Sequence, residues 1–180
     1  MPVTAGALTV KEFVPFLINR TLELSDGAAF RPYTHKRSLL AFGDSITHGW
    51  EGAGKETWAK FFAEGPRRAI NLGTSADRTE HVLWRLTEGG ELDGYEAKCI
   101  LLMIGTNNSG HFPFEKEPPS DTIVGIREIL KTIRAKQPTA KIVLTAIFPR
   151  GADKTDACRR RNEIVNKEIA KYADGETVFW

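Results

Sequence analysis

Apolar residues follow two alternating patterns along the chain. Short runs that are apolar almost throughout, most of them stopping at glycine or proline, predict buried strands at 39–42, 69–72, 99–104, 141–147 and 177–180. Segments with apolar residues three or four positions apart predict helices at 58–63, 78–86, 121–135 and 156–172. Two stretches rich in glycine or proline, 51–57 and 111–120, are predicted to be loops.

Strands and helices alternate from residue 39 onward, which favours an α/β fold with right-handed βαβ crossovers. The run 99–104 is apolar throughout, as is typical of parallel strands buried on both faces, so the sheet is expected to be covered on both sides. A chain of 180 residues predicts one domain, placed at 39–180. Residues 1–38 are interpreted as an N-terminal extension to which no function is assigned.

Charge and composition narrow the function classes. A net charge of +2 gives no electrostatic argument for nucleic acid or an anionic membrane as a partner. Two distant cysteines make neither a disulfide framework nor a metal cluster, and the four histidines lack zinc-ligand spacing, so no metal or cofactor is expected. The one dense basic run, Arg159-Arg160-Arg161, is interpreted as the solvated face of a helix.

No leader or membrane span is visible in the sequence. The first ten residues lack the basic start and long apolar core of a signal peptide, and no apolar stretch could cross a bilayer. A soluble protein is therefore expected, either cytoplasmic or a trimmed secreted form, and the compartment stays unassigned.

Three predicted strands end in polar turns that begin with glycine. The turns are Gly43-Asp44-Ser45, Gly73-Thr74 and Gly105-Thr106-Asn107-Asn108. Because parallel strands all end at one edge of a sheet, these turns are expected to converge where α/β folds place ligands. Asp44 and Ser45 are both good N-cap residues, so a helix is expected to begin there. The lipase-type G-x-S-x-G elbow and both common nucleotide-binding glycine patterns are absent.

The converging residues suit acyl transfer. The Ser45 hydroxyl can act as a nucleophile if a base accepts its proton. Gly73 has no side chain, so its backbone N–H can approach a substrate closely, and Asn107 offers a side-chain N–H. Together with the Ser45 N–H, these groups predict three donors for the oxyanion of a tetrahedral intermediate.

These blocks resemble those of the SGNH (GDSL-type) hydrolases. Gly43-Asp44-Ser45 matches the first block, Gly73 the second and Gly105-x-Asn107 the third, while Asn108 stands where many members have aspartate. The chain is most similar to the branch of platelet-activating-factor acetylhydrolase catalytic subunits. That similarity is carried by the segments 81–86, 105–108, 148–151 and 161–166.

The resemblance implies both a fold and an activity. The implied fold is a flavodoxin-like three-layer sandwich with strand order 2-1-3-4-5. Ser45 would be the nucleophile, and Gly73, Asn107 and the Ser45 amide would be the oxyanion donors. The implied reaction is removal of a short acyl group, with acetyl favoured, from a carbohydrate or other small ester through an acyl-serine intermediate.

One departure from the family concerns the general base. The fourth family block, Asp-x-x-His, supplies the base and the residue that orients it, and no such motif occurs in this sequence. The chain is therefore expected to be an N-terminal portion, truncated at the fifth strand and lacking the last helix. Its expected partners are a small ester and either the missing segment or a second copy.

Other residues and other functions offer alternatives to this interpretation. His48 and His81 are possible substitute bases, but His48 is expected to point away and His81 to be a packing residue. His111 is expected near the substrate mouth, and Arg78 and Arg150 on the surface. Three tryptophans are expected in the core or at its rim: Trp50, Trp84 and Trp180. The alternative functions are a non-catalytic binding domain and an inactive fragment.

Overall fold

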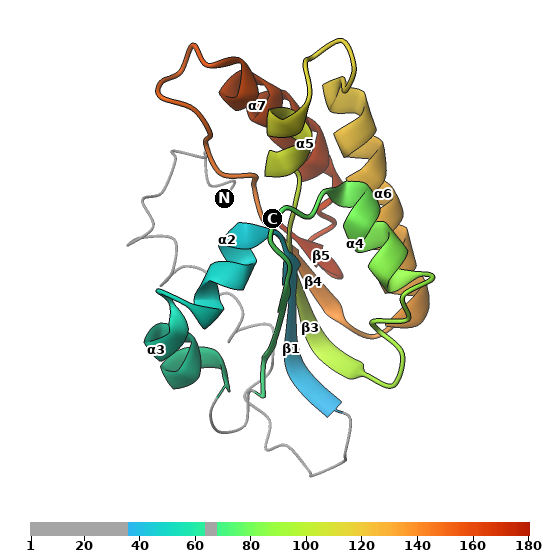
Figure 1. The fold of residues 1–180 in the computed structure, drawn as a ribbon. Helices are drawn as coiled ribbons and strands as arrows, with labels where there is room; N and C mark the ends of the chain where they lie inside the picture. Colours follow the sequence, from blue (N-terminus) through green and yellow to red (C-terminus); the bar gives the residue numbers. More distant parts are fainter. Residues whose placement is uncertain (1–35, 64–67) are drawn as a thin grey trace.

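The computed structural model describes residues 36–63 and 68–180, so nearly all of the expected extension lies outside the described residues. Five strands form one sheet in the order β2-β1-β3-β4-β5, and every neighbouring pair is parallel (Figure 1). The strands are β1 (Lys36–Gly43), β2 (Ile70–Gly73), β3 (Glu96–Met103), β4 (Lys141–Leu144) and β5 (Val178–Phe179). The predicted fold class and strand order are confirmed.

Helices cover both faces of this sheet (Figure 1). They are α2 (Ser45–His48), α3 (Lys55–Trp58), α4 (Thr79–Leu86), α5 (Thr106–His111), α6 (Pro119–Lys136) and α7 (Ala157–Ile169). Short helical turns follow three of them: η1 (Gly49–Glu51), η2 (Ala59–Ala63) and η3 (Ala170–Tyr172). Helices α2 and α3 lie on one side, whereas α4 and α6 lie on the other, with α7 packed against α6.

The two faces of β1 take part in different cores, because successive strand side chains point in opposite directions. Leu40 and Phe42 belong to the larger core, which also contains the buried apolar residues of α4, α6 and α7. Leu39 and Ala41 belong to a smaller core on the other face, which includes Phe62 of η2. The three-layer arrangement thus follows from strands that are apolar on both faces.

Several predicted boundaries differ from the structure. Helix α3 begins at Lys55, inside the predicted loop 51–57, and β4 ends at Leu144 instead of continuing to residue 147. The predicted turn after β3 contains a short helix, α5. It follows directly on Gly105, whose φ of 126° is a conformation that favours glycine.

The apolar spacing along α7 predicts that Ile164 faces inward, but Ile164 is 46% exposed, so this prediction is wrong. Trp84 on α4, which was expected in the core or at its rim, is 60% exposed and lies outside the core. Cys99, by contrast, is fully buried in β3 as predicted, and desolvation raises the pKa of its thiol to about 12. A thiol held neutral in this way is a packing residue and not a nucleophile.

The described ranges hold neither a candidate membrane span nor a candidate metal cluster. Among residues 36–63 and 68–180, no helix combines the length and the apolar character needed to cross a bilayer. In the same ranges, no three histidine, cysteine, aspartate or glutamate side chains are grouped as metal ligands would be.

Candidate active site

The register of the sheet brings the three predicted turns together. Gly43 at the end of β1 pairs with Gly73 on β2 and with Met103 on β3. Neighbouring strands lie about 4.8 Å apart, so the segments that follow these residues leave the same edge side by side. Ser45 comes two residues after Gly43, and Asn107 comes four residues after Met103. The predicted convergence of the three segments is therefore confirmed.

Ser45 opens α2, whose N-cap is Asp44. The Asp44 carboxylate accepts a hydrogen bond from the Ile46 N–H at 2.9 Å, which is the predicted capping geometry. Desolvation raises the pKa of Asp44, the hydrogen bond from Ile46 opposes that shift, and the nearby Asp77 carboxylate reinforces it. Ser45 itself is exposed, and no residue of the described ranges hydrogen-bonds to its hydroxyl.

The ends of β1 and β2 lie close beneath α2. A Cβ added to Gly43 would lie 2.1 Å from Thr47 Oγ1. One added to Gly73 would lie 2.4 Å from the backbone nitrogen of His48. Neither position has room for a side chain. Glycine at these strand ends is thus explained by the docking of the serine-bearing helix, independently of any role in oxyanion binding.

Asn71 is a site residue that the sequence analysis missed. Its side chain donates to the Thr47 carbonyl at 3.0 Å and accepts from the Gly73 N–H at 3.0 Å. The predicted oxyanion donor Gly73 is therefore already bonded within the protein, and an oxyanion would compete with Asn71 for that N–H. Asparagine two residues before glycine is a pattern typical of such local side-chain bonds and was the available signal.

Asn107 is buried near the start of α5, beside the loop that precedes α4. Its Nδ2 donates to the Asp77 carbonyl at 2.8 Å. Arg150, in the segment after β4, donates through Nη1 to the Thr106 carbonyl at 3.0 Å and to Asn107 Oδ1 at 3.5 Å. Arg150 was expected on the surface, but it is half-buried against α5.

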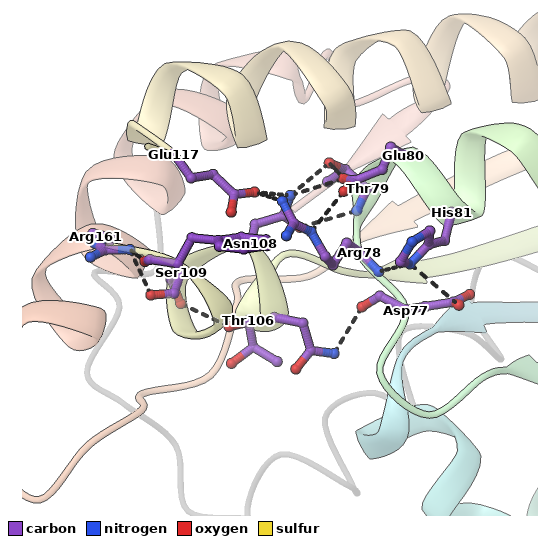
Figure 2. Close-up of polar contacts among 12 residues, drawn as sticks. Asp77, Arg78, Thr79, Glu80, His81, Thr106, Asn108, Ser109, Glu117 and Arg161 are labelled. Carbon is purple, nitrogen blue, oxygen red and sulfur yellow. Dashed lines mark hydrogen bonds and ion pairs between the residues drawn. The ribbon is translucent and has the colours of Figure 1, made fainter. Parts of the chain in front are cut away.

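A buried polar network lies behind α5 (Figure 2). Asn108 accepts from the Thr79 N–H at 3.0 Å and donates to Glu117 Oε1 at 2.9 Å. Arg78 forms ion pairs with Glu117 and with Glu80. The side chain of Arg78 is only 12% exposed, so the expectation of a surface arginine is wrong.

Arg161 holds the other end of α5. It lies in the basic run that was interpreted as a solvated face, but it is buried, and its Nη1 donates to the carbonyls of Ser109 and Phe112, both at 2.8 Å (Figure 2). The last carbonyls of a helix have no partner within the helix and need an outside donor. The prediction fails at Arg161 because this helix end supplies acceptors, while Arg160 beside it is exposed as expected.

His48 and His81 make their hydrogen bonds with residues other than Ser45. His48 Nδ1 lies 2.9 Å from Ser75 Oγ, and its Nε2 lies 3.6 Å from Glu51. His81 Nδ1 accepts from the Arg78 N–H, and its side chain is 54% exposed. Neither ring hydrogen-bonds to Ser45. His111 is exposed at the end of α5.

Comparisons with known proteins agree with this architecture. The bovine "Platelet-activating factor acetylhydrolase IB subunit alpha1" is 36% identical over 118 residues, which cover 64% of this chain and 47% of that protein. The human "Platelet-activating factor acetylhydrolase IB subunit alpha2" is 37% identical over 129 residues, which cover 72% of this chain and 51% of that protein. The chain thus spans about half the length of the curated relatives it matches.

Solved structures show the same fold at low sequence identity. A GDSL-like lipase from Bacteroides thetaiotaomicron superposes with a TM-score of 0.62 at 17% identity, covering 90% of this chain and 75% of that one. The acetylxylan esterase Axe2 from Geobacillus stearothermophilus gives 0.61 at 18% identity, covering 81% and 74%. The model of the GDSL-like Lipase/Acylhydrolase family matches residues 41–180, and the chain belongs to that family.

Proposed function

We propose that these residues form the nucleophile and oxyanion half of a serine ester hydrolase. The observation that carries the proposal is the position of Ser45, exposed at the N-terminus of α2 on the edge where Asn107 also lies. Membership of an acylhydrolase family supports it. The Ser45 oxygen would attack the ester carbonyl carbon, and the alcohol would leave as the acyl-serine forms.

The proposed oxyanion donors are the N–H groups of Ser45 and Gly73 and the Nδ2 of Asn107. Helix geometry supports the first, since the N–H at the start of a helix has no partner within it. Asn107 has a second Nδ2 hydrogen besides the one given to Asp77. The Gly73 N–H would become the third donor once it breaks its hydrogen bond to Asn71. Each such donor typically contributes about 10²–10³ in kcat.

The proposal assigns the general base to an Asp-x-x-His segment acting together with these residues. Within the described ranges, no side chain hydrogen-bonds to the Ser45 hydroxyl, and His48 and His81 have other partners. A histidine held by an aspartate would take the proton from Ser45 and return it to the leaving alcohol. Water would then attack the acyl-serine, with the same histidine accepting its proton, and the acyl group would be released from Ser45.

The proposed substrate is a small ester with a short acyl group, and acetyl is favoured. The names of the two relatives specify acetylhydrolase subunits, and that of the Geobacillus structure specifies an acetylxylan esterase. The second candidate is a non-catalytic binding domain. The lack of a described proton acceptor at Ser45 and the bond from Gly73 to Asn71 favour it.

Covalent labelling separates the two candidates. A fluorophosphonate probe would be reacted with the chain extended by an Asp-x-x-His segment from a relative, and the labelled peptide identified by mass spectrometry. The hydrolase proposal expects label on Ser45, none in Ser45→Ala, and little on residues 1–180 alone. Label on another residue, or none in an extended chain that hydrolyses esters, would contradict it. A folded extended chain with neither label nor hydrolysis would support the binding domain.

A further inference from the structure

The side-chain amide of Asn107 lies between two groups of opposite hydrogen-bonding character. The Asp77 carbonyl can only accept, and the Arg150 guanidinium can only donate. Nδ2 must therefore face Asp77, at 2.8 Å, and Oδ1 must face Arg150, at 3.5 Å. One Nδ2 hydrogen is used by Asp77. The other has no acceptor among residues 36–63 and 68–180.

Arg150 is itself fixed against α5. Its Nη1 donates to the Thr106 carbonyl at 3.0 Å, one residue before Asn107. Its guanidinium also lies across Gly110 on the same helix, where an added Cβ would be 2.3 Å from Arg150 Cζ. The planar guanidinium thus reaches the start of α5 and lies flat along it. A lysine ammonium, which is a compact point charge, does not reproduce this arrangement.

We propose that Arg150 is a positioning residue that holds the Asn107 amide with its free N–H toward the acyl site. The inference rests on the proposed function, because it assigns that N–H to the oxyanion. Without Arg150, among the described residues only the hydrogen bond to the Asp77 carbonyl would hold the amide, and its free N–H would be aimed less firmly at the developing negative charge. A charged donor on Oδ1 also polarises the amide and strengthens its N–H as a donor.

Arg161 offers a matched control on the same helix. It is another arginine from outside α5 that donates to backbone carbonyls at its end, those of Ser109 and Phe112, but it has no bond to the Asn107 side chain. If both arginines only support α5, their replacement should disturb Asn107 alike. If Arg150 acts through Asn107, the two should differ.

The first test uses the 180-residue chain and needs no activity. The Asn107 side-chain NH₂ signals would be assigned in ¹⁵N-labelled protein by their loss in Asn107→Ala. We expect them to shift and broaden in Arg150→Gln and to stay in place in the matched variant Arg161→Gln. Gly110→Ala should reproduce the change with every charge retained, because its Cβ displaces only the flexible end of Arg150. Unchanged signals in both Arg150→Gln and Gly110→Ala would overturn the proposal.

The second test measures kinetics in the chain extended by an Asp-x-x-His segment. Arg150→Gln should lower kcat by about 10- to 100-fold with little change in KM, and this loss should vanish in an Asn107→Ala background. Arg161→Gln should cost a similar factor in either background. An equal loss from Arg150→Gln with and without Asn107 would overturn the proposal. If the extended chain hydrolyses nothing, the proposed function fails, and the NMR test still decides the role of Arg150.

Discussion

The two sides of the candidate site are held to very different degrees. On the α5 side, Asn107 and Asn108 are buried, and arginines and a glutamate from other parts of the chain bind the helix at both ends. On the α2 side, Ser45 is exposed on a helix of four residues that is capped by Asp44. The α5 side, which carries the proposed donor Asn107, is thus held by several buried contacts, while the proposed nucleophile has no proton acceptor among the described residues.

This difference indicates which part of the reaction the described residues are equipped for. Prearranged donors stabilise charge without reorganising at the moment of reaction. A serine hydroxyl without a base remains protonated near neutral pH and attacks poorly. The chemistry is therefore expected to be limited by proton transfer from Ser45, and not by oxyanion binding.

The largest expected effect tests the nucleophile side. In the chain extended by an Asp-x-x-His segment, Ser45→Ala should reduce kcat for p-nitrophenyl acetate on the order of 10⁶-fold. Residues 1–180 alone should match their own Ser45→Ala variant, because no described base reaches the hydroxyl. Strong Ser45-dependent turnover by the 180-residue chain would mean that His48 or His81 acts as the base, and the comparison of the two sides would fail.

The second prediction concerns the stability of the α5 side. Glu117→Ala removes one of the two described ion-pair partners of Arg78 and one acceptor of the Asn108 amide, so it should lower the free energy of unfolding by about 1–3 kcal/mol. Glu115→Ala, an exposed position on the same loop, should stay within about 0.5 kcal/mol of the parent. Urea unfolding measures both. Equal stabilities of the two variants would show that the network does not hold α5.

Two neighbouring asparagines give a third test, which separates catalysis from stability. Asn107→Ala should reduce kcat of the extended chain by roughly 10²–10³, about 3–4 kcal/mol, with little change in KM. Asn108→Ala should act mainly on stability, because among residues 36–63 and 68–180 its amide bonds only to Thr79, Glu80 and Glu117. Steady-state kinetics and urea unfolding of both variants measure the split. A few-fold or smaller loss of kcat in Asn107→Ala would remove it from the oxyanion donors.

The strands and the meeting of the three turns could be predicted because they depend on patterns local in sequence. Apolar runs that stop at glycine marked the strands, and the edge where parallel strands end is a property of the fold class. The order 2-1-3-4-5 came from the family resemblance and not from the pattern. The local structure of each turn after its strand was less well predicted. The short helix α5, which follows Gly105, is the example.

The missed features depend on contacts between residues distant in sequence. Arg161 donates to carbonyls 49 and 52 residues away, at the end of a helix that was not predicted, so nothing near it signalled burial. Ile164, which lies on α7 together with Arg161, was predicted to face inward from its apolar character alone. The hydrogen bond from the Gly73 N–H to Asn71 is local in sequence. The residue pattern does not say whether this N–H will bind Asn71 or a substrate.

The smallest expected effect tests the cap of the α2 side. Desolvation raises the pKa of Asp44, Asp77 reinforces this shift, and the hydrogen bond from Ile46 and the charge of Arg150 oppose it. Since the folded state then holds the proton more tightly than the unfolded state, the ionised carboxylate costs stability above the raised pKa. That cost disappears as the pH falls through the raised pKa toward 3.8.

Asp44→Asn keeps an oxygen for the Ile46 N–H but removes the charge, so it should be more stable than the parent at pH 7 and lose this advantage near pH 4. Asp44→Ala, which lacks the cap, should be less stable than Asp44→Asn by about 1 kcal/mol at both pH values. Urea unfolding at the two pH values measures all three proteins, and a difference between Asp44→Asn and the parent that does not change with pH would contradict the raised pKa.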